Sequence, residues 1–559
     1  MYCGDETGAF IGDVGSHTAR FGYGGDDCPT LVVPSAVYSR PSNENGSSNY
    51  SHRTGRAKYS APVSVMRMPP DDCISANGKS GEGVGFIPIY QSLNSNNEKK
   101  YPSGNDTDDG VIQDFDAWAS LWEYSFQALC VRGKGKHTMG HKYLSEPELQ
   151  PEAALSSSQS QTIPSESKMD GPIDHPLLAV DSTSRTVHPK LQEKQRALML
   201  ETLFESLSAP AAYIAPSPML SSFAYGRQTS LVIDVGHSGS RVTPLVDGYC
   251  LSNGSVSSGR GGRWLGNIQK SVLEGVWDVN GTIVNNWNGW GDASGDSGRP
   301  PCREGGIIPR YLLHPTSPEK CSGNKLEIMK QSSFHSMAIH EVMYEMMTSS
   351  HIRTLESSEE ESVPFCGYGD KDEESTRLDN DVDMEVDKKE DEDDDDEGSC
   401  YVLPDGTKVD LAHSRAGKDL CRLPELLYSE TLPSFIQPTT NDNNNYSGNM
   451  LPLQQLIHKS LTQILDVNLR KELSSNIILT GGASLFPTLD KRLSIELGKV
   501  LPSSYKYKVI ASKNSVENRY SAWIGGSILS SLGSFQQLWL SKKEYEECGS
   551  VLGLQRFKN

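Results

Sequence analysis

The chain has 559 residues and a formal net charge of −20, and because one ordinary core does not hold so many residues, we predict two or more domains. Apolar residues make up only 36% of the chain, which predicts polar segments that interrupt the folded part. Eleven cysteines without a Cys-x-x-Cys pair exclude a disulfide scaffold or a zinc site, and no apolar run reaches the ~18 residues of a membrane span. We therefore expect a protein of the nucleus or cytosol with no membrane partner.

Most of the negative charge lies in one segment, residues 356–400. This segment holds 21 acidic and four basic residues, a local charge of −17 that leaves only −3 for the remainder of the chain. Because such a run repels itself and buries no apolar area, we predict a disordered acidic loop. The loop either only keeps the surface solvated or docks basic proteins such as histones. Phosphates would be repelled, so we expect no direct sequence-specific binding of nucleic acid.

The first 130 residues alternate between ordered and polar stretches. Residues 9–34 predict a strand, a tight turn and a second strand, whereas residues 39–110 are rich in Ser, Asn and Gly and predict loops around a short apolar piece. A helix is predicted from "DFDAWASLWEYSFQALCV", in which apolar side chains recur at helical spacing. We expect these side chains in the core: Phe115, Trp118, Leu121, Trp122, Phe126 and Leu129.

Beyond a polar insert at 133–172, strands and helices interleave. The stretch "HPLLAVD" predicts a short strand, and residues 188–207 predict an amphipathic helix that Pro189 opens. A second strand, turn and strand follow at 231–246, and the block after residue 450 alternates helices with strands. This interleaving predicts an α/β architecture.

The two strand–turn–strand units contain the same unusual turn. "AFIGDVGSHTARFGYG" and "SLVIDVGHSGSRVTPL" both pass from an apolar strand through Asp-Val-Gly into another strand. Gly15 and Gly236 have no Cβ, so the N–H groups of each turn can converge on an anion such as a phosphate, and the Ser16 hydroxyl can donate to the same group. Asp13 and Asp234 would repel phosphate, which favours a hydrated Mg²⁺ held between them.

A third element supports a nucleotide. "NIILTGGASLF" is an apolar strand that ends in Gly481 and Gly482 and leads into a helix. Adjacent glycines allow the backbone to approach a flat or anionic group closely. Each of the three elements is weak evidence alone, but their order along one chain is a specific signal.

Four stretches carry a resemblance to a known family: "DVGSHTARFGYGGDDCPTLVVPS", "DVGHSGSRVTPLVDGYCL", "ILTGGASLFP" and "RYSAWIGGSILSSLGSFQQLWLSKKEYEECG". They resemble the actin family, and the likeness covers most of the ordered chain and is strongest at its two ends. Within that family the ends, together with an acidic insert before "YVLPDGTKVDL", look most like the nuclear actin-related proteins of chromatin-remodelling and histone-acetyltransferase assemblies.

The resemblance implies an actin-like fold of two lobes, each built on a related, RNase H-like α/β domain. ATP or ADP with Mg²⁺ would lie between the lobes. The implied domains are a first-lobe core at 1–38, 111–224 and 521–559, a small first-lobe subdomain at 39–110, a second-lobe core at 225–260 and 446–520, and a second-lobe outer subdomain at 261–445 that includes the insert 356–400.

The same resemblance assigns the nucleotide-binding residues. Arg20 and Arg519 stand where the family has lysines, which keeps the charge but changes its geometry. His237 replaces a carboxylate of the second turn and weakens the attraction for a metal. The implied set is Asp13, Gly15, Ser16 and Arg20 at the first turn, Asp234, Gly236 and His237 at the second, and Gly481, Gly482 and Arg519 at the adenosine, with Asp13 and Asp234 holding Mg²⁺ through water.

Two substitutions bear on catalysis. Ser217 stands where actin has a glutamine that orients the attacking water, and Arg241 stands where actin has the partner histidine. A short serine positions a water poorly. We therefore expect nucleotide binding with little hydrolysis and assign no catalytic residue.

The C-terminal block implies a partner. Trp523, Ile524 and Leu529 lie on a predicted helix, most of which we expect in the lobe core. In the actin family this block also borders an apolar groove that accepts partner helices. The implied partner is a helix of a remodelling ATPase or acetyltransferase scaffold, with actin alongside, and the implied location is the nucleus.

Two alternatives stay open. A filament-forming cytoskeletal ATPase is disfavoured by Ser217, by Arg241 and by the polar inserts, which add bulk where filament contacts would form. A sugar kinase or a chaperone ATPase uses similar paired phosphate loops, but the C-terminal resemblance argues against both. The histidines of "HTMGH", residues 137–141, lack a third ligand in their polar surroundings, so we expect no metal there.

Overall fold

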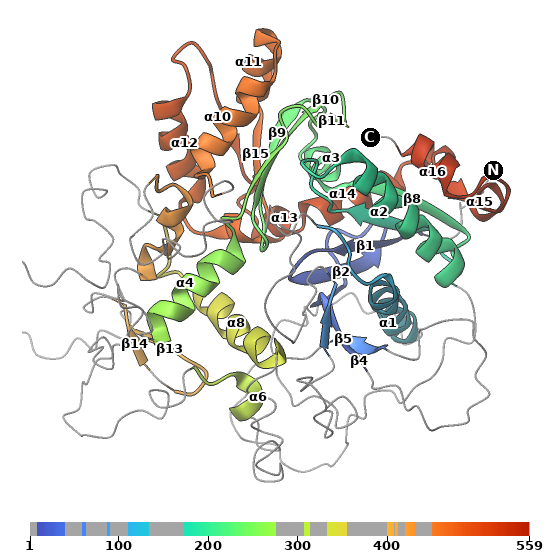
Figure 1. The fold of residues 1–559 in the computed structure, drawn as a ribbon, viewed down its shortest axis with the longest axis horizontal. Coiled ribbons are helices and arrows are strands. Elements are labelled where there is room, and N and C mark those ends of the chain that lie inside the picture. Colours follow the sequence, from blue (N-terminus) through green and yellow to red (C-terminus); the bar gives the residue numbers. More distant parts are fainter. Residues whose placement is uncertain are drawn as a thin grey trace, which may run out of the picture.

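The computed structural model describes residues 8–39, 59–62, 86–89, 110–133, 173–274, 307–313, 333–354, 400–406, 408–411, 420–430 and 450–557. Within these residues two large sheets carry the fold (Figure 1), and a three-stranded and a two-stranded sheet accompany them. In this part of the chain no helix is both long enough and apolar enough to cross a membrane.

The first sheet contains β1 (Phe10–Val14), β2 (Thr18–Tyr23), β3 (Leu31–Pro34), β7 (Leu177–Asp181), β8 (Ala211–Pro216) and β17 (Leu540–Ser541). Its order is β17-β8-β7-β1-β2-β3, with β1 antiparallel to β2 and parallel to β7. β1, β7 and β8 are buried along their whole length, which is typical of strands covered on both faces. The covering helices are α1 (Phe115–Gly133), α2 (Pro189–Glu201) and α14 (Ser521–Ser531).

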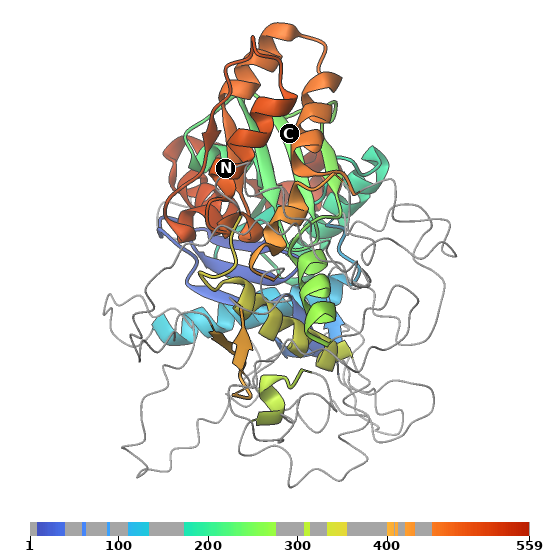
Figure 2. The ribbon, with the colours of Figure 1, turned by 90° about the vertical axis from the view of Figure 1, so that its left-hand side faces the viewer.

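The second sheet contains β9 (Ser230–Val235), β10 (Ser240–Val246), β11 (Tyr249–Cys250), β12 (Val256–Ser258), β15 (Ile477–Thr480) and β16 (Val509–Ile510). β9 is antiparallel to β10 and parallel to β15. It therefore occupies the same place in this sheet as β1 does in the first, between an antiparallel hairpin partner and a parallel strand. Three helices, α10 (Leu453–Gln463), α11 (Val467–Ser475) and α12 (Leu489–Val500), stand around this sheet, above the blue strands of the first sheet in Figure 2.

Each sheet has its own apolar core. The core around the first sheet contains the fully buried rings of Trp118, Trp122 and Trp523. The core around the second sheet consists mainly of aliphatic side chains from β9, β15 and the helices packed beside them. Two separate cores explain why the chain forms two lobes rather than one larger globule.

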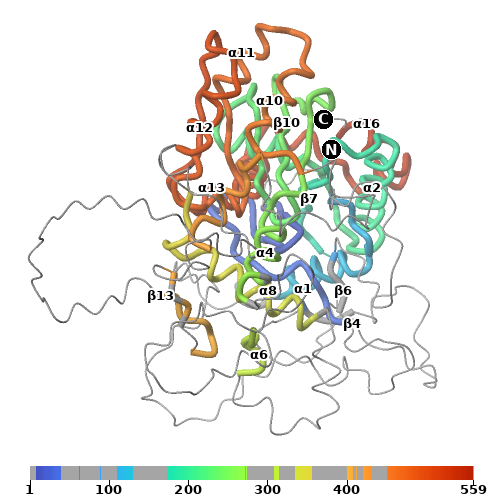
Figure 3. The backbone as a smooth tube through the Cα atoms, turned by 60° about the vertical axis from the view of Figure 1, so that its left-hand side comes forward, coloured from blue at the N-terminus to red at the C-terminus, as the bar shows by residue number. Residues whose placement is uncertain are grey.

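Smaller elements extend both lobes. In the second lobe α4 (Gly262–Glu274) packs side by side with α8 (Ser333–Met347), as Figure 3 shows. The other described elements of these two extensions are α6 (Arg310–Leu313), β13 (Cys400–Val402), β14 (Lys408–Asp410) and the 3-10 turn η6 (Leu423–Leu427) in the second lobe, and β4 (Ala36–Ser39), β5 (Tyr59–Pro62) and β6 (Phe86–Pro88) in the first.

The two lobes are joined where α3 (Ser217–Ala224) crosses α14. A Cβ on Gly525 of α14 would overlap the carbonyl oxygen of Leu220, so the helices touch through their backbones. Hydroxyl groups continue the contact: Ser521 lies 3.0 Å from Ser221 and 2.6 Å from Thr480 at the end of β15. The chain ends in η9 (Gly533–Gln537), α15 (Lys542–Cys548) and α16 (Ser550–Arg556).

The α/β architecture predicted from the sequence is confirmed. The predicted helix at 114–131 forms as α1, and its regularly spaced apolar residues are buried or pack on the first core. The predicted helix at 188–207 begins as α2, with Pro189 in its first turn, and passes at Thr202–Ser206 into a π-helical turn, η3. The predicted domain boundaries stay a prediction. The polar insert beyond residue 133, the acidic loop up to residue 399 and the "HTMGH" motif lie outside the described residues.

Candidate functional site

The two Asp-Val-Gly turns are copies of one another in three dimensions. The backbone N–H of Gly15 donates to the carbonyl of Thr18 at 3.0 Å, and the N–H of Gly236 donates to the carbonyl of Gly239 at 2.9 Å. Each turn is thus closed by a hydrogen bond between residues three apart. Ser16 is half-buried in the first turn and follows Gly15 directly.

An aspartate and an arginine face each other across each hairpin. Asp13 is opposite Arg20 in the β1–β2 register, and Asp234 is opposite Arg241 in the β9–β10 register. Arg20 Nη1 donates to Asp13 Oδ2 at 2.6 Å. Arg241 Nη1 instead donates to the carbonyl of Ser182 at 2.8 Å, a residue that follows β7 of the first sheet. The arginine of the second hairpin therefore ties the two lobes together.

Asp234 is a buried carboxylate whose nearby arginines do not fully offset the effect of burial on its pKa. Burial raises its pKa, and Asp13 adds to this effect, although Arg241 and Arg20 partly oppose it. A divalent cation beside the two aspartates would stabilise the charged form of Asp234. Among the described residues no three His, Cys, Asp or Glu side chains are grouped as metal ligands. Two aspartate carboxylates suit a hydrated Mg²⁺, which takes its remaining ligands from water and phosphate.

The glycine pair after β15 reaches the second turn. Gly481 has φ = +101°, and a Cβ there would overlap Oδ1 of Asp234 and the carbonyl oxygen of Val235. Only glycine fits this position. At Gly482, by contrast, no heavy atom of the described residues other than its chain neighbours lies within 4 Å of where its Cβ would be, so a ligand can approach its backbone. A short 3-10 turn, η8 (Gly482–Leu485), follows, and the next α-helix is α12.

Arg20 and Arg519 are brought together by an aromatic ring. The guanidinium of Arg20 lies 5.4 Å, and that of Arg519 5.8 Å, from the centre of the Tyr520 ring. These are cation–π distances. The two arginines, almost 500 residues apart in sequence, thus flank one residue at the junction of the lobes.

Two buried nitrogen atoms in the site have no hydrogen-bond partner among the described residues. They are Nε of Arg20 and Nδ1 of His237. Unpaired buried polar atoms are costly and are rare in native proteins. Because both lie at the facing turns, they are suited to an anionic ligand.

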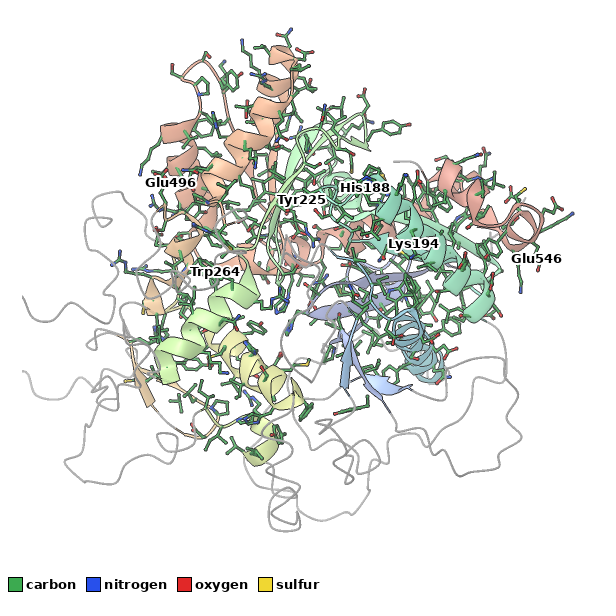
Figure 4. All side chains as sticks on the ribbon, in the orientation of Figure 1. His188, Lys194, Tyr225, Trp264, Glu496 and Glu546 are labelled. Atoms are coloured by element: carbon green, nitrogen blue, oxygen red, sulfur yellow. The ribbon has the colours of Figure 1, made fainter. Side chains whose placement is uncertain are left out.

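Asn518 is a structural residue of the site that the sequence analysis missed. Its backbone carbonyl accepts from Thr480 Oγ1 at 2.7 Å, and its side chain contacts Ser484 at 3.0 Å and Tyr225 at 3.1 Å. Tyr225 follows α3 and is labelled in Figure 4. Asn518 therefore holds the glycine turn, α13 (Ser515–Arg519) and the end of α3 in one arrangement. A lone asparagine before the "RYSAW" stretch has no sequence signal that could have revealed this role.

The structure also places Ser217, which stands where actin has its water-orienting glutamine, and the three residues predicted to border the partner groove. Ser217 is half-buried at the first position of α3. Ile524 and Leu529 are partly buried against the first core. Trp523 is fully buried, and its Nε1 lies 3.4 Å from the carbonyl oxygen of Ile11. Its assignment to a surface groove is wrong, because its indole is part of the first-lobe core.

Two sheets that repeat one hairpin, with their glycine turns face to face, define a duplicated two-lobed fold. The family model described as Actin matches residues 4–558, and the chain therefore belongs to the actin family. This fold generally binds a nucleotide with Mg²⁺. Among the similar proteins within the family are actin-related proteins of one type, from both plants and fungi.

Three of these relatives show the extent of the match. Actin-related protein 4 of Oryza sativa subsp. japonica is 28% identical over 554 residues, which is 98% of each chain. Actin-related protein 4 of Arabidopsis thaliana is 27% identical over 557 residues, again 98% of each chain. Actin-related protein 4 of Saccharomyces cerevisiae is 26% identical over 588 aligned positions, covering 98% of this chain and 96% of the relative.

Proposed function

We propose that this protein is a nuclear, non-filamentous actin-related subunit of chromatin-remodelling and histone-acetyltransferase complexes. It would bind ATP or ADP with Mg²⁺ between its lobes, with little hydrolysis, and dock a partner helix together with actin. The observation that carries the proposal is the pair of matching glycine turns, joined by Gly481, in a chain that matches Actin-related protein 4 over almost its full length.

The residues of the turns suit a nucleotide in three ways. The N–H groups of the turn residues that follow Gly15 and Gly236, with the unpaired Nε of Arg20, would hold phosphate oxygens. Gly482 leaves its backbone open to the adenosine. Bound Mg²⁺ supplies charge neutralisation of the phosphates, and Asp13 with Asp234 would hold it through water.

The proposed lack of turnover rests on Ser217 and Arg241. Hydrolysis needs a group that orients a water and a group that accepts its proton. A serine hydroxyl at the start of α3 is short, and an arginine is always protonated and cannot accept a proton. Arg241 also donates to the Ser182 carbonyl. Arg241 would therefore serve the contact between the lobes rather than the reaction.

The proposed docking surface lies at the end of α14. Ile528, Leu532 and Leu538 are 40%, 41% and 46% exposed, in a stretch that continues the first-lobe core to the surface. Three large apolar side chains that face solvent along one stretch of the chain are suited to a helix-in-groove contact. These three residues, rather than Trp523, would contact the partner.

The test is purification of the tagged full-length protein from nuclear and cytosolic extracts, with stoichiometric partners identified by mass spectrometry. We expect actin and a large remodelling or acetyltransferase subunit in the nuclear fraction. The variant L532D/L538D should lose the scaffold partner, because two charges would be buried in the contact. Val551→Asp on α16, where the side chain is 60% exposed, is the matched control and should keep it.

The same preparation tests the remaining parts of the proposal. A single-turnover assay on the purified protein should show that bound ATP persists for longer than it does on actin. Recovery from the cytosol as a polymer, or hydrolysis at the rate of actin, would favour the filament-forming ATPase instead.

A further inference from the structure

The second sheet ends in a strand that is flanked by lysines. β16 is the last strand in the order of this sheet, next to β15. Lys506 and Lys508 precede β16 and Lys513 follows it, and all three side chains are exposed. None of the three forms an ion pair within the part of the chain that the structure describes. An edge strand offers backbone groups to another extended chain, and here the edge is basic.

Backbone hydrogen bonds hold this edge in place. The N–H of Lys508 donates to the carbonyl of Ser474 at 3.1 Å, and the N–H of Ile477 in β15 donates to the carbonyl of Lys508 at 3.0 Å. The Ser474 hydroxyl also donates to the carbonyl of Lys506 at 3.2 Å. Because successive residues of a parallel strand direct their backbone groups to opposite sides, Val509 presents its N–H and C=O on the outer side of the sheet.

The lysines lie on one face of the chain that leads into β16. The hydroxyl of Tyr507 is 2.8 Å from where a Cβ on Gly498 of α12 would lie, and Val509 packs against the second core. These two residues alternate with Lys506 and Lys508, whose side chains are exposed. Since side chains of an extended chain alternate between its faces, the two ammonium groups project on the face away from α12, about 7 Å apart along the chain. Carboxylates at alternate positions of an extended acidic peptide have the same spacing.

The acidic segment of the sequence starts beside the same helix. Thr354, the last described residue before it, is fully buried. Its N–H donates to the carbonyl of Pro487 at 3.2 Å, and its hydroxyl lies 2.9 Å from that of Thr488, which directly precedes α12. α12 has 12 residues and is therefore about 18 Å long. The 45 residues from 355 to 399 could extend over roughly 150 Å, so the edge beside the far end of α12 is within their reach.

We propose that the acidic segment, residues 356–399, docks on the basic edge of its own lobe, alongside β16. The segment holds 21 acidic and four basic residues, so its charge is complementary to that of Lys506 and Lys508. Single exposed ion pairs contribute little, but the tether at Thr354 raises the effective concentration of the segment at the edge to the millimolar range. An added strand would also gain main-chain hydrogen bonds.

The docked segment would compete with other basic partners of the same acidic residues. A basic protein that binds residues 356–399 would first have to displace them from the lysine edge. The proposal therefore gives the segment a role in limiting such binding rather than only in solvating the surface. It is independent of the nucleotide site, so either proposal can fail without the other.

The first experiment is zero-length carbodiimide cross-linking of an equal mixture of ¹⁴N- and ¹⁵N-labelled full-length protein, read by mass spectrometry. At about 50 mM salt we expect cross-links from Lys506 or Lys508 to residues 356–399 within one isotope label, and at about 1 M salt their loss. They should be at least about fivefold more abundant than cross-links from Lys543 to the same segment. Lys543 is exposed on α15 of the first lobe, on the opposite side of the molecule from α12 (Figure 1).

The second experiment measures the dissociation constant of decalysine for two charge-reversed variants by isothermal titration calorimetry. K506E/K508E and K542E/K543E change the formal charge of the chain by the same amount, but only the first removes the proposed docking site. We expect K506E/K508E to bind decalysine at least about threefold more tightly than K542E/K543E, because its acidic segment is released.

Three outcomes would overturn the proposal. Equal cross-linking at Lys543 and at the lysines before β16 would show that the segment has no preferred contact. Cross-links mainly between the two isotope labels would make a second copy of the chain the occupant. Equal decalysine affinities of the two variants would mean that the lysines only protect the edge from pairing. The cross-linking uses unchanged protein, so it decides the question even if a variant fails to fold.

Discussion

Gly481 occupies a position that only glycine fits. Its φ of +101° belongs to a region that residues with a side chain avoid, and its Cβ position is already filled by Asp234 and Val235. Close packing of β15 on the second turn is possible only because this side chain is absent. Its neighbour Gly482 has neither constraint. A substitution at Gly482 is therefore a control for the same substitution at Gly481.

We expect alanine substitutions at the two glycines to differ in their effect on stability. Gly481→Ala should lower the free energy of unfolding by about 1–3 kcal/mol, from backbone strain and the displaced Asp234, and should weaken nucleotide binding. Gly482→Ala should change the free energy of unfolding by no more than about 0.5 kcal/mol. Urea denaturation monitored by circular dichroism measures both. Equal destabilisation by the two substitutions would contradict this account of the turn.

The two helices at the lobe junction depend on a similarly close contact. Gly525 of α14 lies against the carbonyl of Leu220 in α3, and the neighbouring Gly526 packs against Leu178 and Ile11 of the first sheet. Small residues allow α14 to lie between α3 and β1. This position places Ser521 at the start of α14 within reach of both Ser221 and Thr480.

We expect Gly525→Ala to push α14 away from α3. An added methyl group that overlaps a backbone oxygen typically costs about 1–3 kcal/mol of stability, and here it should also break the Ser521 contacts. Gly533→Ala, in the exposed η9 turn where no described atom beyond its chain neighbours lies within 4 Å of the added Cβ, should be nearly neutral. Differential scanning calorimetry of the two variants tests the difference, and a neutral Gly525→Ala would show that the helices are not locked by this crossing.

The contact between the lobes is polar and contains titratable groups. His17 of the first lobe faces His237, Glu341 and Tyr344 of the second. Burial would raise the pKa of Glu341, but the hydrogen bond and charge of His17, together with Arg519 and Arg310, lower it. Burial lowers the pKa of His237, and that of His340 is lowered in the same way. The lobes therefore meet through groups whose charge depends on pH.

The sign of the pH effect follows from His237. In the unfolded chain its imidazole takes up a proton near pH 6.5, the ordinary value, whereas in the folded protein it does so only at much lower pH. The unfolded state then binds more protons below pH 6.5, so this contribution to stability is present above that pH and is lost as the pH falls. One such group changes the free energy of unfolding by at most about 1.4 kcal/mol per pH unit.

The measurement is the unfolding free energy of wild-type protein and His237→Gln between pH 7.5 and pH 5.5. The decline toward low pH should be shallower in the variant, while His188→Gln, outside the contact between the lobes, should follow wild type. Parallel curves for wild type and His237→Gln would mean that another group causes the loss of stability.

Local patterns were enough to predict the α/β architecture, helix α1 and the repeated Asp-Val-Gly turn, because apolar periodicity and turn glycines report directly on the backbone. The repeat even extends to an arginine seven residues after each aspartate, Arg20 and Arg241, a regularity that the sequence analysis did not use. What each arginine does differs, since Arg20 binds Asp13 while Arg241 reaches Ser182 in the other lobe. Partners so distant in sequence are chosen by how the two lobes pack.

Tertiary packing alone decided the stack of His17 on His237, the burial of Trp523 and the role of Asn518. The two histidines are 220 residues apart, and neither has a sequence neighbour that indicates the other. Trp523 and Ile528 lie on one helix in which small residues, several of them buried serines, alternate with apolar ones, so periodicity could not tell the core face from the exposed one. The chain's local signals define the turns, but only the meeting of two separately folded cores determines what lies between them.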